Sequence, residues 1–180
     1  PNSLIEILQW FEDQNSHVWI VGGANRHALL GTKILEYDLA TTMTPLEMKA
    51  YPDTIPTGEK YGTITFRNRG EHYEITTLRT ESGYNDGRRP DEVEWGDSLR
   101  VDLSRRDLTM NAIAVDVSKE TYYDPYNGCK DLQQKRIRSV GDPSKRLSED
   151  ALRILRTYRF MDQGKAGIWW PDLKLAAALR

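Results

Sequence analysis

The chain has 180 residues, 38% of them hydrophobic and 29% charged, which excludes a disordered chain and suits one medium-sized domain. A formal net charge of −2 excludes a globally basic nucleic-acid binder, so any such site must be a local cluster of Arg and Lys. The single cysteine, Cys129, excludes an internal disulfide, and no apolar run reaches membrane-spanning length, so we expect a soluble cytoplasmic protein that enters no membrane.

The first third of the chain is predicted to alternate helices with short strands. Apolar residues recur at the spacing of a helix face, and β-branched and aromatic residues gather in the runs that we interpret as strands. The predicted segments are a helix over 3–13, a strand over 17–21, a helix over 24–31 and a strand over 36–40. Thr44, followed by Pro45 and by Glu47, is the pattern of a capped helix start.

The middle of the chain contains a hairpin and then a stretch without a pattern. Residues 61–67 and 71–78 alternate apolar and polar side chains around the turn "NRG", which predicts a β-hairpin. Residues 80–97 are rich in Gly, Asp, Arg and Pro and have no apolar period. We therefore expect an unusually long loop there, and such loops are often functional.

The last part of the chain is predicted to be mainly helical. The expected elements are helices over 98–104 and 108–115, strands over 121–124 and 136–140, a helix over 148–160 and a last helix after Pro171. Ser148 is a favourable N-cap, with two acids in the first turn behind it.

Gly22 and Gly23 stand between a predicted strand and a predicted helix. Glycines at such a point let the backbone approach a ligand closely, and a helix N-terminus presents free N–H groups to an anion. Arg26, one turn into the helix, would add positive charge for a phosphate. The same pattern is also typical of an ordinary strand-to-helix turn, so it does not define a site alone.

Three acids stand in apolar surroundings on predicted strands. Glu36 and Asp38 are two residues apart, so on one strand their side chains would point the same way, about 6–7 Å apart. Glu74 follows on a later strand. Mg²⁺ is usually held by one or two carboxylates together with substrate phosphates, and such ions serve in-line displacement at phosphorus. The alternatives are a charged edge strand for the pair and an outward-facing residue for Glu74.

Several stretches, all in order, carry a family resemblance. They are "VGGANRHALLG", "EYDLAT", "TIPTGEKYGTITF", "YEITTLRTESGYNDGRRP", "RRDLTMNAIAVD", "DPYNGCKDLQQKRIRSVGDP" and "RLSEDALRILRTYRF". Together they resemble the class II tRNA nucleotidyltransferases, the CCA-adding enzymes, and the similar bacterial poly(A) polymerases. The resemblance implies an α+β fold of the polymerase-β nucleotidyltransferase type, a small mixed sheet with helices on one side, over 1–142. The start of an all-α neck follows over 143–180, without the body and tail of the family.

The resemblance also implies roles for individual residues. Glu36 and Asp38 match the acid pair that binds Mg²⁺, with Mn²⁺ as the alternative metal and Glu74 as a further candidate ligand. The residues implied for the triphosphate are Gly22, Gly23 and Arg26. Those implied for the ribose and phosphate are Arg105, Arg106 and Asp107 of the "RRD" element, with Asn111. The loop residues Asp86, Gly87, Arg88 and Arg89 match a mobile loop that helps the family switch from C to A addition. Without the resemblance, "SRRDL" would be interpreted as a solvated helix end.

Glu149, Asp150 and Arg153 match the "EDxxR" element, which in the family is the protein template for the incoming base. Asp150 and Arg153 are three apart, which puts them on one face of the predicted helix. An Asp accepts from the exocyclic amine of C or A, and an Arg donates to the neighbouring ring nitrogen, whereas U and G present the opposite order. Arg156, a further step of three, is expected to steady the base or a phosphate. The alternative is a surface ion pair.

Two positions depart from the family pattern. The first acid of the pair is Glu36 where the family has Asp, which places the carboxylate one methylene further out, and Mg²⁺ tolerates poor geometry badly. The residue after Arg26 is His27, where the family again has Asp.

These observations lead to one leading hypothesis and three alternatives. We expect a template-independent RNA nucleotidyltransferase that adds C, A or both from CTP and ATP to the tRNA 3′ end and releases pyrophosphate. The close alternative is a poly(A) polymerase, and a more distant one is a toxin that modifies tRNA ends. From a different class, the alternative is a non-catalytic nucleotide- or RNA-binding module, which the departures at Glu36 and His27 motivate.

Overall fold

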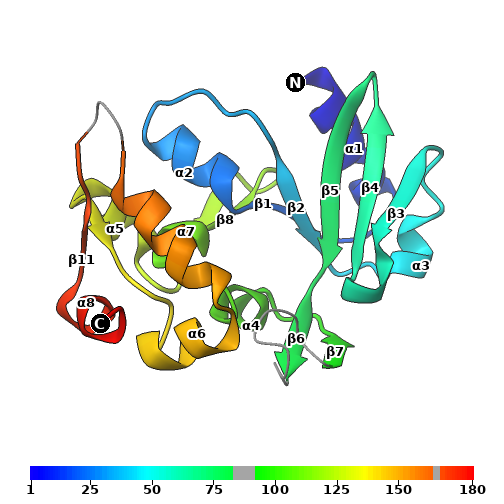
Figure 1. Ribbon diagram of the computed structural model, residues 1–180. Coiled ribbons are helices and arrows are strands. Elements are labelled where there is room, and N and C mark those ends of the chain that lie inside the picture. Colours follow the sequence, from blue (N-terminus) through cyan, green and yellow to red (C-terminus); the bar gives the residue numbers. More distant parts are fainter. Residues whose placement is uncertain (83–91, 164–166) are drawn as a thin grey trace.

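The computed structural model describes residues 1–82, 92–163 and 167–180, and it has a mixed α+β fold (Figure 1). The main sheet has seven strands in the order β3-β4-β5-β2-β1-β8-β9. Its strands are β1 (Val18–Val21), β2 (Asp38–Thr41), β3 (Thr54–Gly58), β4 (Thr63–Asn68), β5 (Glu71–Thr77), β8 (Ala114–Asp116) and β9 (Thr121–Tyr123). Strands β2 and β5 run parallel, and the other neighbouring pairs of this sheet are antiparallel. The α+β class with a mixed sheet, predicted from the sequence, is confirmed.

Short helices and two small ribbons surround this sheet. The helices are α1 (Asn2–Asp13), α2 (Gly23–Leu29), α3 (Pro45–Met48), α4 (Leu99–Ser104), α5 (Gly128–Gln133), α6 (Pro143–Glu149), α7 (Leu152–Met161) and α8 (Leu173–Ala178), with 3-10 turns η1 (Glu59–Tyr61) and η2 (Thr109–Asn111). The ribbons pair β6 (Arg79–Ser82) with β7 (Glu92–Trp95) and β10 (Arg136–Ile137) with β11 (Trp170–Pro171). Among the described residues, no helix is both long enough and apolar enough to span a membrane.

Strand β2 separates two hydrophobic cores. Leu39 is fully buried with Ile7 and Phe11 of α1, so this side of the strand faces the first helix. Its neighbour Ala40 belongs to a different cluster, together with Leu103 of α4. Because successive side chains of a strand point to opposite faces, Asp38 points to the same side as Ala40, away from α1. The candidate acid therefore faces the side on which the helices after β7 are built.

The C-terminal helices share a core with the part of the chain that we expect to be the catalytic head. Leu147 of α6, Phe160 of α7 and Leu175 of α8 pack with Met110 of η2 and with Ile137 of β10. Figure 1 shows α5 to α8 gathered at the side of the molecule away from β3, β4 and β5. The division at 142/143 stays a prediction, because one cluster of buried side chains extends across it.

The structure corrects several predicted elements. The predicted strand over 36–40 starts too early, because β2 begins only at Asp38 and Glu36 lies before it. The predicted helix over 108–115 is instead the single 3-10 turn η2 followed by strand β8, which pairs with β1 and β9. This segment is almost wholly buried, including its polar residues Thr109 and Asn111, so it has no solvent-facing side and the pattern does not distinguish a helix from a strand.

The predicted helix over 148–160 is also wrong, because two helices meet there. Asp142, not Ser148, caps the first of them by accepting from the N–H of Lys145 at 2.8 Å. The helix ends at Asp150, whose backbone is extended (φ −149°, ψ 110°), and α7 begins two residues later. Asp150 and Arg153 therefore do not lie on the face of one continuous helix.

The predicted loop over 80–97 contains most of the β6–β7 ribbon in its described part. Strand β6 follows β5 after a single residue, so the ribbon extends from the end of β5 (Figure 1). Trp95 anchors the ribbon on the main sheet at Gly62, where an added Cβ would lie 2.7 Å from the indole ring. The predicted mobile-loop residues Asp86, Gly87, Arg88 and Arg89 lie outside the described residues.

Candidate active site

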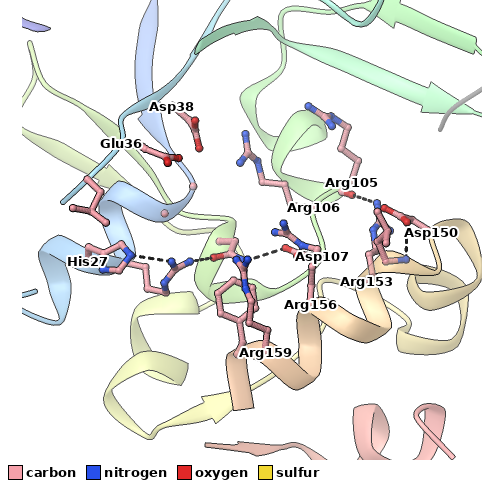
Figure 2. Close-up of a pocket in the computed structure, with 17 residues that line it drawn as sticks. His27, Glu36, Asp38, Arg105, Arg106, Asp107, Asp150, Arg153, Arg156 and Arg159 are labelled. Carbon is pink, nitrogen blue, oxygen red and sulfur yellow. Dashed lines mark hydrogen bonds and ion pairs between the residues drawn. The ribbon is translucent and has the colours of Figure 1, made fainter. Parts of the chain in front are cut away.

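A pocket of about 690 Å³ lies where α2, the start of β2, the segment after α4, and α7 come together. Figure 2 shows the side chains that line it. From the first half of the chain these are Gly22, Gly23, Arg26, Glu36 and Asp38, with His27 and Leu35. From the second half they are Arg105, Arg106, Asp107, Asn111, Asp150 and Arg153, with Leu152, Arg156, Arg159 and Phe160. Most of the candidate residues, widely separated in sequence, therefore share one cavity.

The side chains of Glu36 and Asp38 lie at one end of this pocket (Figure 2). Burial raises the pKa of Asp38, the negative charges of Glu74 and Glu36 raise it further, and Arg106 partly offsets them. The fold therefore holds Asp38 in surroundings that disfavour its charged form. A bound cation would relieve this cost, so the electrostatics of these acids fit a divalent metal.

Glu74 lies beside Asp38 but outside the pocket. The two residues occupy paired positions on the parallel strands β5 and β2, and the side chain of Glu74 is exposed. Within residues 1–82, 92–163 and 167–180, no three His, Cys, Asp or Glu side chains gather closely enough to hold a metal by themselves. The described part of the chain thus offers no cage of protein ligands, and most ligands of a Mg²⁺ ion at Asp38 would be substrate phosphates or water.

The backbone at Gly22 passes close to the carboxylate of Asp38. Its backbone is left-handed (φ 71°), and a Cβ at this position would lie 3.1 Å from Oδ2 of Asp38 and 3.6 Å from Nη1 of Arg106. Asn25 supports the turn from below by donating from Nδ2 to the carbonyl oxygens of Ile20 and Ile113, both at 2.8 Å. A side chain at position 22 would therefore crowd Asp38, which is a steric reason for glycine at the first position of the pair.

Asp102, which the sequence analysis did not select, holds both arginines of the "RRD" element. This carboxylate of α4 is 1% exposed and accepts from Nε and Nη2 of Arg105 at 3.0 and 2.7 Å, and from Nη2 of Arg106 at 3.3 Å. Burial opposes ionisation, but the two guanidiniums outweigh it and hold the pKa of Asp102 below its usual value. The sequence contains a pattern that indicates this role. Asp102 stands three residues before Arg105 and four before Arg106, which are the spacings of ion pairs on a helix.

A chain of hydrogen bonds crosses the floor of the pocket. Arg26 donates from Nη1 to Oδ1 of Asn111 at 2.5 Å, and Asn111 donates from Nδ2 to Oδ1 of Asp107 at 3.1 Å. Arg156 of α7 donates from Nε to the other oxygen of Asp107 at 2.8 Å. Asp107 is thereby occupied on both oxygens, so in this arrangement it positions two other pocket residues.

Arg153 is nearly buried and is held by three protein oxygens. Its Nη1 donates to Glu149 at 2.6 Å and to the carbonyl of Arg146 at 3.0 Å, and its Nη2 donates to the carbonyl of Arg105 at 3.0 Å. Arg146 donates to the same oxygen of Glu149 at 2.6 Å. Glu149 does not line the pocket and instead fixes Arg153, whose ion-pair partner is Glu149 and not Asp150.

The pocket brings many guanidinium groups together. Arg26, Arg156 and Arg159 surround the ring of Phe160, with Cζ-to-centroid distances of 4.8, 5.8 and 5.3 Å. Burial lowers the pKa of Arg26, Asp107 opposes this, and Arg159 and Arg156 lower the pKa further. Arg159 and Phe160 were not selected from the sequence, although Arg159 continues the spacing of three from Arg153 and Arg156. Such a concentration of cations suits a polyanionic ligand.

Comparisons with known proteins agree with this geometry. Residues 18–138 match the family model described as the Poly A polymerase head domain. The CCA-adding enzyme of Lactobacillus helveticus is 46% identical over 160 residues, which are 88% of this chain and 40% of that protein. The CCA-adding enzyme of Bacillus pumilus is 44% identical over 160 residues, again 88% of this chain and 40% of that protein.

Solved structures give the same result. The crystal structure of the Bacillus stearothermophilus CCA-adding enzyme in complex with CTP has a TM-score of 0.87 and 35% identity, over 98% of this chain and 42% of that chain. A tRNA nucleotidyltransferase complexed with a primer tRNA and an incoming ATP analogue has a TM-score of 0.75 and 27% identity, over 95% of this chain and 48% of that chain. The chain thus spans about two fifths of the length of the curated relatives that it matches.

Proposed function

The chain belongs to the Poly A polymerase head domain family, and from this membership and the pocket we propose that it is the catalytic head of a tRNA nucleotidyltransferase of the CCA-adding type. It would transfer a nucleotide from CTP or ATP to the 3′ end of tRNA without a nucleic-acid template. The observation that carries the proposal is the order of groups along the pocket. Figure 2 shows Glu36 and Asp38 at one end, Asp150 and Arg153 at the other, and arginines between them.

The reaction needs an attacking hydroxyl, a phosphorus centre and a leaving group in line. The RNA 3′-hydroxyl would attack the α-phosphate, one P–O bond would form, and the bond to pyrophosphate would break. Asp38 and Glu36 are the residues that would hold Mg²⁺, or Mn²⁺ in its place, with Glu74 as a further candidate. When bound there, the ion would lower the pKa of the hydroxyl and neutralise charge on the phosphates.

The triphosphate would lie over the glycine turn among the guanidinium groups. Arg26 and Arg159 line the pocket within reach of the Phe160 ring, and Arg106 lies beside Gly22. Arg106 donates to Asp102 through Nη2, and its Nη1 lies 3.6 Å from the position of a Cβ at Gly22, so Nη1 is the donor directed at a phosphate or ribose oxygen beside the glycine turn. Each of these groups favours the negative charge that the triphosphate carries before and during transfer.

The base of the nucleotide would be selected by hydrogen-bond donors and acceptors of Arg153 and Asp150, at the end of the pocket away from the acid pair. An arginine has five N–H donors, and the three protein oxygens around Arg153 use three of them. Oδ1 of Asp150 accepts from the N–H of Leu152 at 2.9 Å, and Oδ2 has no hydrogen-bond partner among the described residues, so it is the oxygen offered to a base. An acceptor beside a donor complements the edges of C and A and opposes those of U and G.

The test is incorporation of labelled nucleotides into tRNA that lacks its CCA end, with Mg²⁺ and each NTP in turn. Addition of C and A supports the proposal. The second candidate is a poly(A) polymerase, because the matching family is named for that enzyme. Long A tails without C would favour it. Binding of CTP or ATP without any transfer would instead identify a nucleotide-binding module. Addition of nucleotides to tRNA ends that already carry CCA would indicate an end-modifying toxin.

A further inference from the structure

His27 lies between Arg26 and the end of α2, and it lines the same pocket. Its Nε2 lies 3.2 Å from Nη2 of Arg26, and its Nδ1 lies 2.8 Å from Oγ1 of Thr32. Oγ1 of Thr32 also lies 3.2 Å from the carbonyl oxygen of His27. Figure 2 shows His27 at one end of a row of dashed contacts that leads to Asp107. Arg26 and Asn111 make the contacts between these two residues.

These contacts define where the imidazole proton lies. Thr32 has a single hydroxyl proton, and it donates that proton to the carbonyl of His27. Its oxygen is therefore the acceptor toward Nδ1, which must carry a proton. Arg26 can only donate, so Nε2 must offer a lone pair. The hydrogen bonds are satisfied together only by a neutral His27 with its proton on Nδ1.

This tautomer restrains Arg26 at both terminal nitrogens. Nη2 donates to His27, and Nη1 donates to Asn111, which is fixed in turn by Asp107. A guanidinium held on two sides loses little freedom when it binds a phosphate, because the ordering cost has already been met in folding. A protonated His27 would present an N–H to the N–H of Arg26 and add a second positive charge beside it.

We propose that neutral His27 is a positioning residue for Arg26, and that protonation of His27 releases this arginine and weakens binding of the nucleoside triphosphate. The inference rests on the proposed function, since it concerns the nucleotide of that site. It makes nucleotide affinity depend on pH through a side chain that need not touch the nucleotide.

The charges around His27 set the direction of its titration. Burial lowers the pKa of His27, and the charge of Arg26 lowers it further. The free protein therefore carries neutral His27 at pH 7, and the ring gains its proton only below the usual histidine value of about 6.5. The other charged groups that line the same pocket are Arg105, Arg106, Arg153, Arg156 and Arg159 as cations, with Glu36, Asp38, Asp107 and Asp150 as anions.

The first experiment compares the wild-type chain with His27→Gln, whose amide oxygen accepts from Arg26 and does not titrate. Binding of CTP with Mg²⁺ would be measured by equilibrium dialysis at pH 7.5 and pH 5.5. We expect wild-type affinity to fall severalfold more than that of H27Q. The lowered pKa of His27 keeps this difference below about tenfold, because part of the ring is still neutral at pH 5.5. The change that H27Q retains reports the titration of the nucleotide and the carboxylates. Equal changes in both proteins overturn the inference, and so does tighter wild-type binding at pH 5.5, which would mean that protonated His27 binds phosphate itself.

The second experiment needs no nucleotide. The chain has three histidines, and H27Q identifies the ¹⁵N signals of His27 by their loss. We expect neutral His27 with its proton on Nδ1, and a mixture of tautomers in Thr32→Val but not in Thr32→Ser, which keeps the hydroxyl. A proton on Nε2 in the wild type would overturn the inference.

The two measurements separate the possible failures. If neither CTP nor ATP binds at pH 7.5, the proposed function is contradicted, and the nucleotide part of this inference falls with it. If nucleotides bind but the tautomer or the pH difference is not as expected, the inference alone is wrong.

Discussion

Arg156 donates from Nε to Oδ2 of Asp107 at 2.8 Å and so joins α7 to the segment between α4 and η2. The two ends of this contact differ in their access to water, since 46% of the Arg156 side chain is exposed but only 10% of the Asp107 side chain. Removing the arginine would leave a nearly buried carboxylate with one fewer partner. The cost of such a loss is the desolvation of the remaining charge.

Arg156→Met is therefore expected to lower the free energy of unfolding by about 1–3 kcal/mol at pH 7. Arg67→Met is a matched control, because the side chain of Arg67 is also 46% exposed but its partner, Asp53, is 48% exposed. That exposed pair should contribute less than about 1 kcal/mol. Urea unfolding of both variants measures the difference, and equal losses would show that the burial of Asp107 does not matter.

The stability that the ion pair of Arg156 and Asp107 contributes depends on pH, and the pKa shift of Asp107 gives the direction. Burial alone would raise the pKa of Asp107, but Arg156, Asn111 and the N–H of Leu108 outweigh it and hold the pKa below its usual value. A depressed folded pKa contributes stability above the unfolded value of about 3.9, and this contribution is lost as the pH falls through the folded pKa. The stability difference between wild type and R156M should thus shrink below about pH 4.

The members of the pocket were largely predictable from the sequence, but their partners were not. Motifs in order pointed to Glu36, Asp38, Arg26 and the "RRD" and "EDxxR" elements, and all but Glu149 of these line the cavity. Hydrogen-bond partners depend on where helices end, and a break such as that at Asp150 is set by tertiary packing that no local pattern records. Glu149 is four residues before Arg153 and Asp150 is three before it, so both spacings allow an ion pair, and only the structure shows that Glu149 is the partner.

Buried segments were the other source of error. The segment after Leu108 buries its polar residues as well as its apolar ones, so its sequence lacks the periodicity that separates a helix from a strand. Its identity as η2 and β8 is decided by β1, which offers an edge for pairing at Ile20 and Val21. The ribbon β6–β7 was missed for a different reason, because its strands are short and polar and are held by Trp95 on Gly62.

Asp38→Asn should stabilise the fold and abolish nucleotide transfer. Burial and the neighbouring acids raise the pKa of Asp38, so its charge destabilises the folded state at neutral pH. The penalty is absent below the unfolded value of about 3.9 and grows as the pH rises through the folded pKa. We expect D38N to be more stable than the wild type at pH 7 and equally stable near pH 3, as measured by urea unfolding.

Metal binding provides the second readout of this substitution. Millimolar Mg²⁺ should raise the unfolding temperature of the wild type and leave that of D38N unchanged. Glu36→Gln is the comparison, since Glu36 lies outside β2 and is exposed, and it should retain part of the Mg²⁺ effect. A full Mg²⁺ effect in D38N would show that the metal binds elsewhere.

Gly22→Ala should damage both stability and nucleotide binding. The substitution places a Cβ at a left-handed backbone position (φ 71°) and 3.1 Å from the Asp38 carboxylate. Gly31→Ala is the matched control, because its φ of 64° is similar but nothing lies within 4 Å of the new Cβ. Backbone strain should cost G31A about 1 kcal/mol in urea unfolding, and G22A more, because φ 71° with ψ −135° lies outside the left-handed helical region. Only G22A should also lose CTP affinity. Equal CTP binding by the two variants would exclude the close contact with Asp38 as the reason for the glycine.

Asp150→Ala should change which base is accepted rather than whether a nucleotide binds. Oδ1 of Asp150 is occupied by the N–H of Leu152, so Oδ2 is the acceptor that would distinguish C from U. Loss of one base-reading group should reduce the preference for CTP over UTP by about tenfold or more, as judged by competition binding. Asp142→Ala is the matched control, because Asp142 caps the other end of α6 and does not line the pocket.

Glu149→Gln extends the same test to a residue outside the pocket. Glu149 accepts from Arg146 and Arg153 through one oxygen, so an amide would weaken both contacts and loosen Arg153. D142A should lose about 1 kcal/mol of stability and keep the preference for CTP, since only a helix cap is removed. E149Q should lose part of the preference without any change in the groups that face the base. If E149Q and D142A retain the same preference, the position of Arg153 does not depend on Glu149, and base choice is set by Asp150 alone.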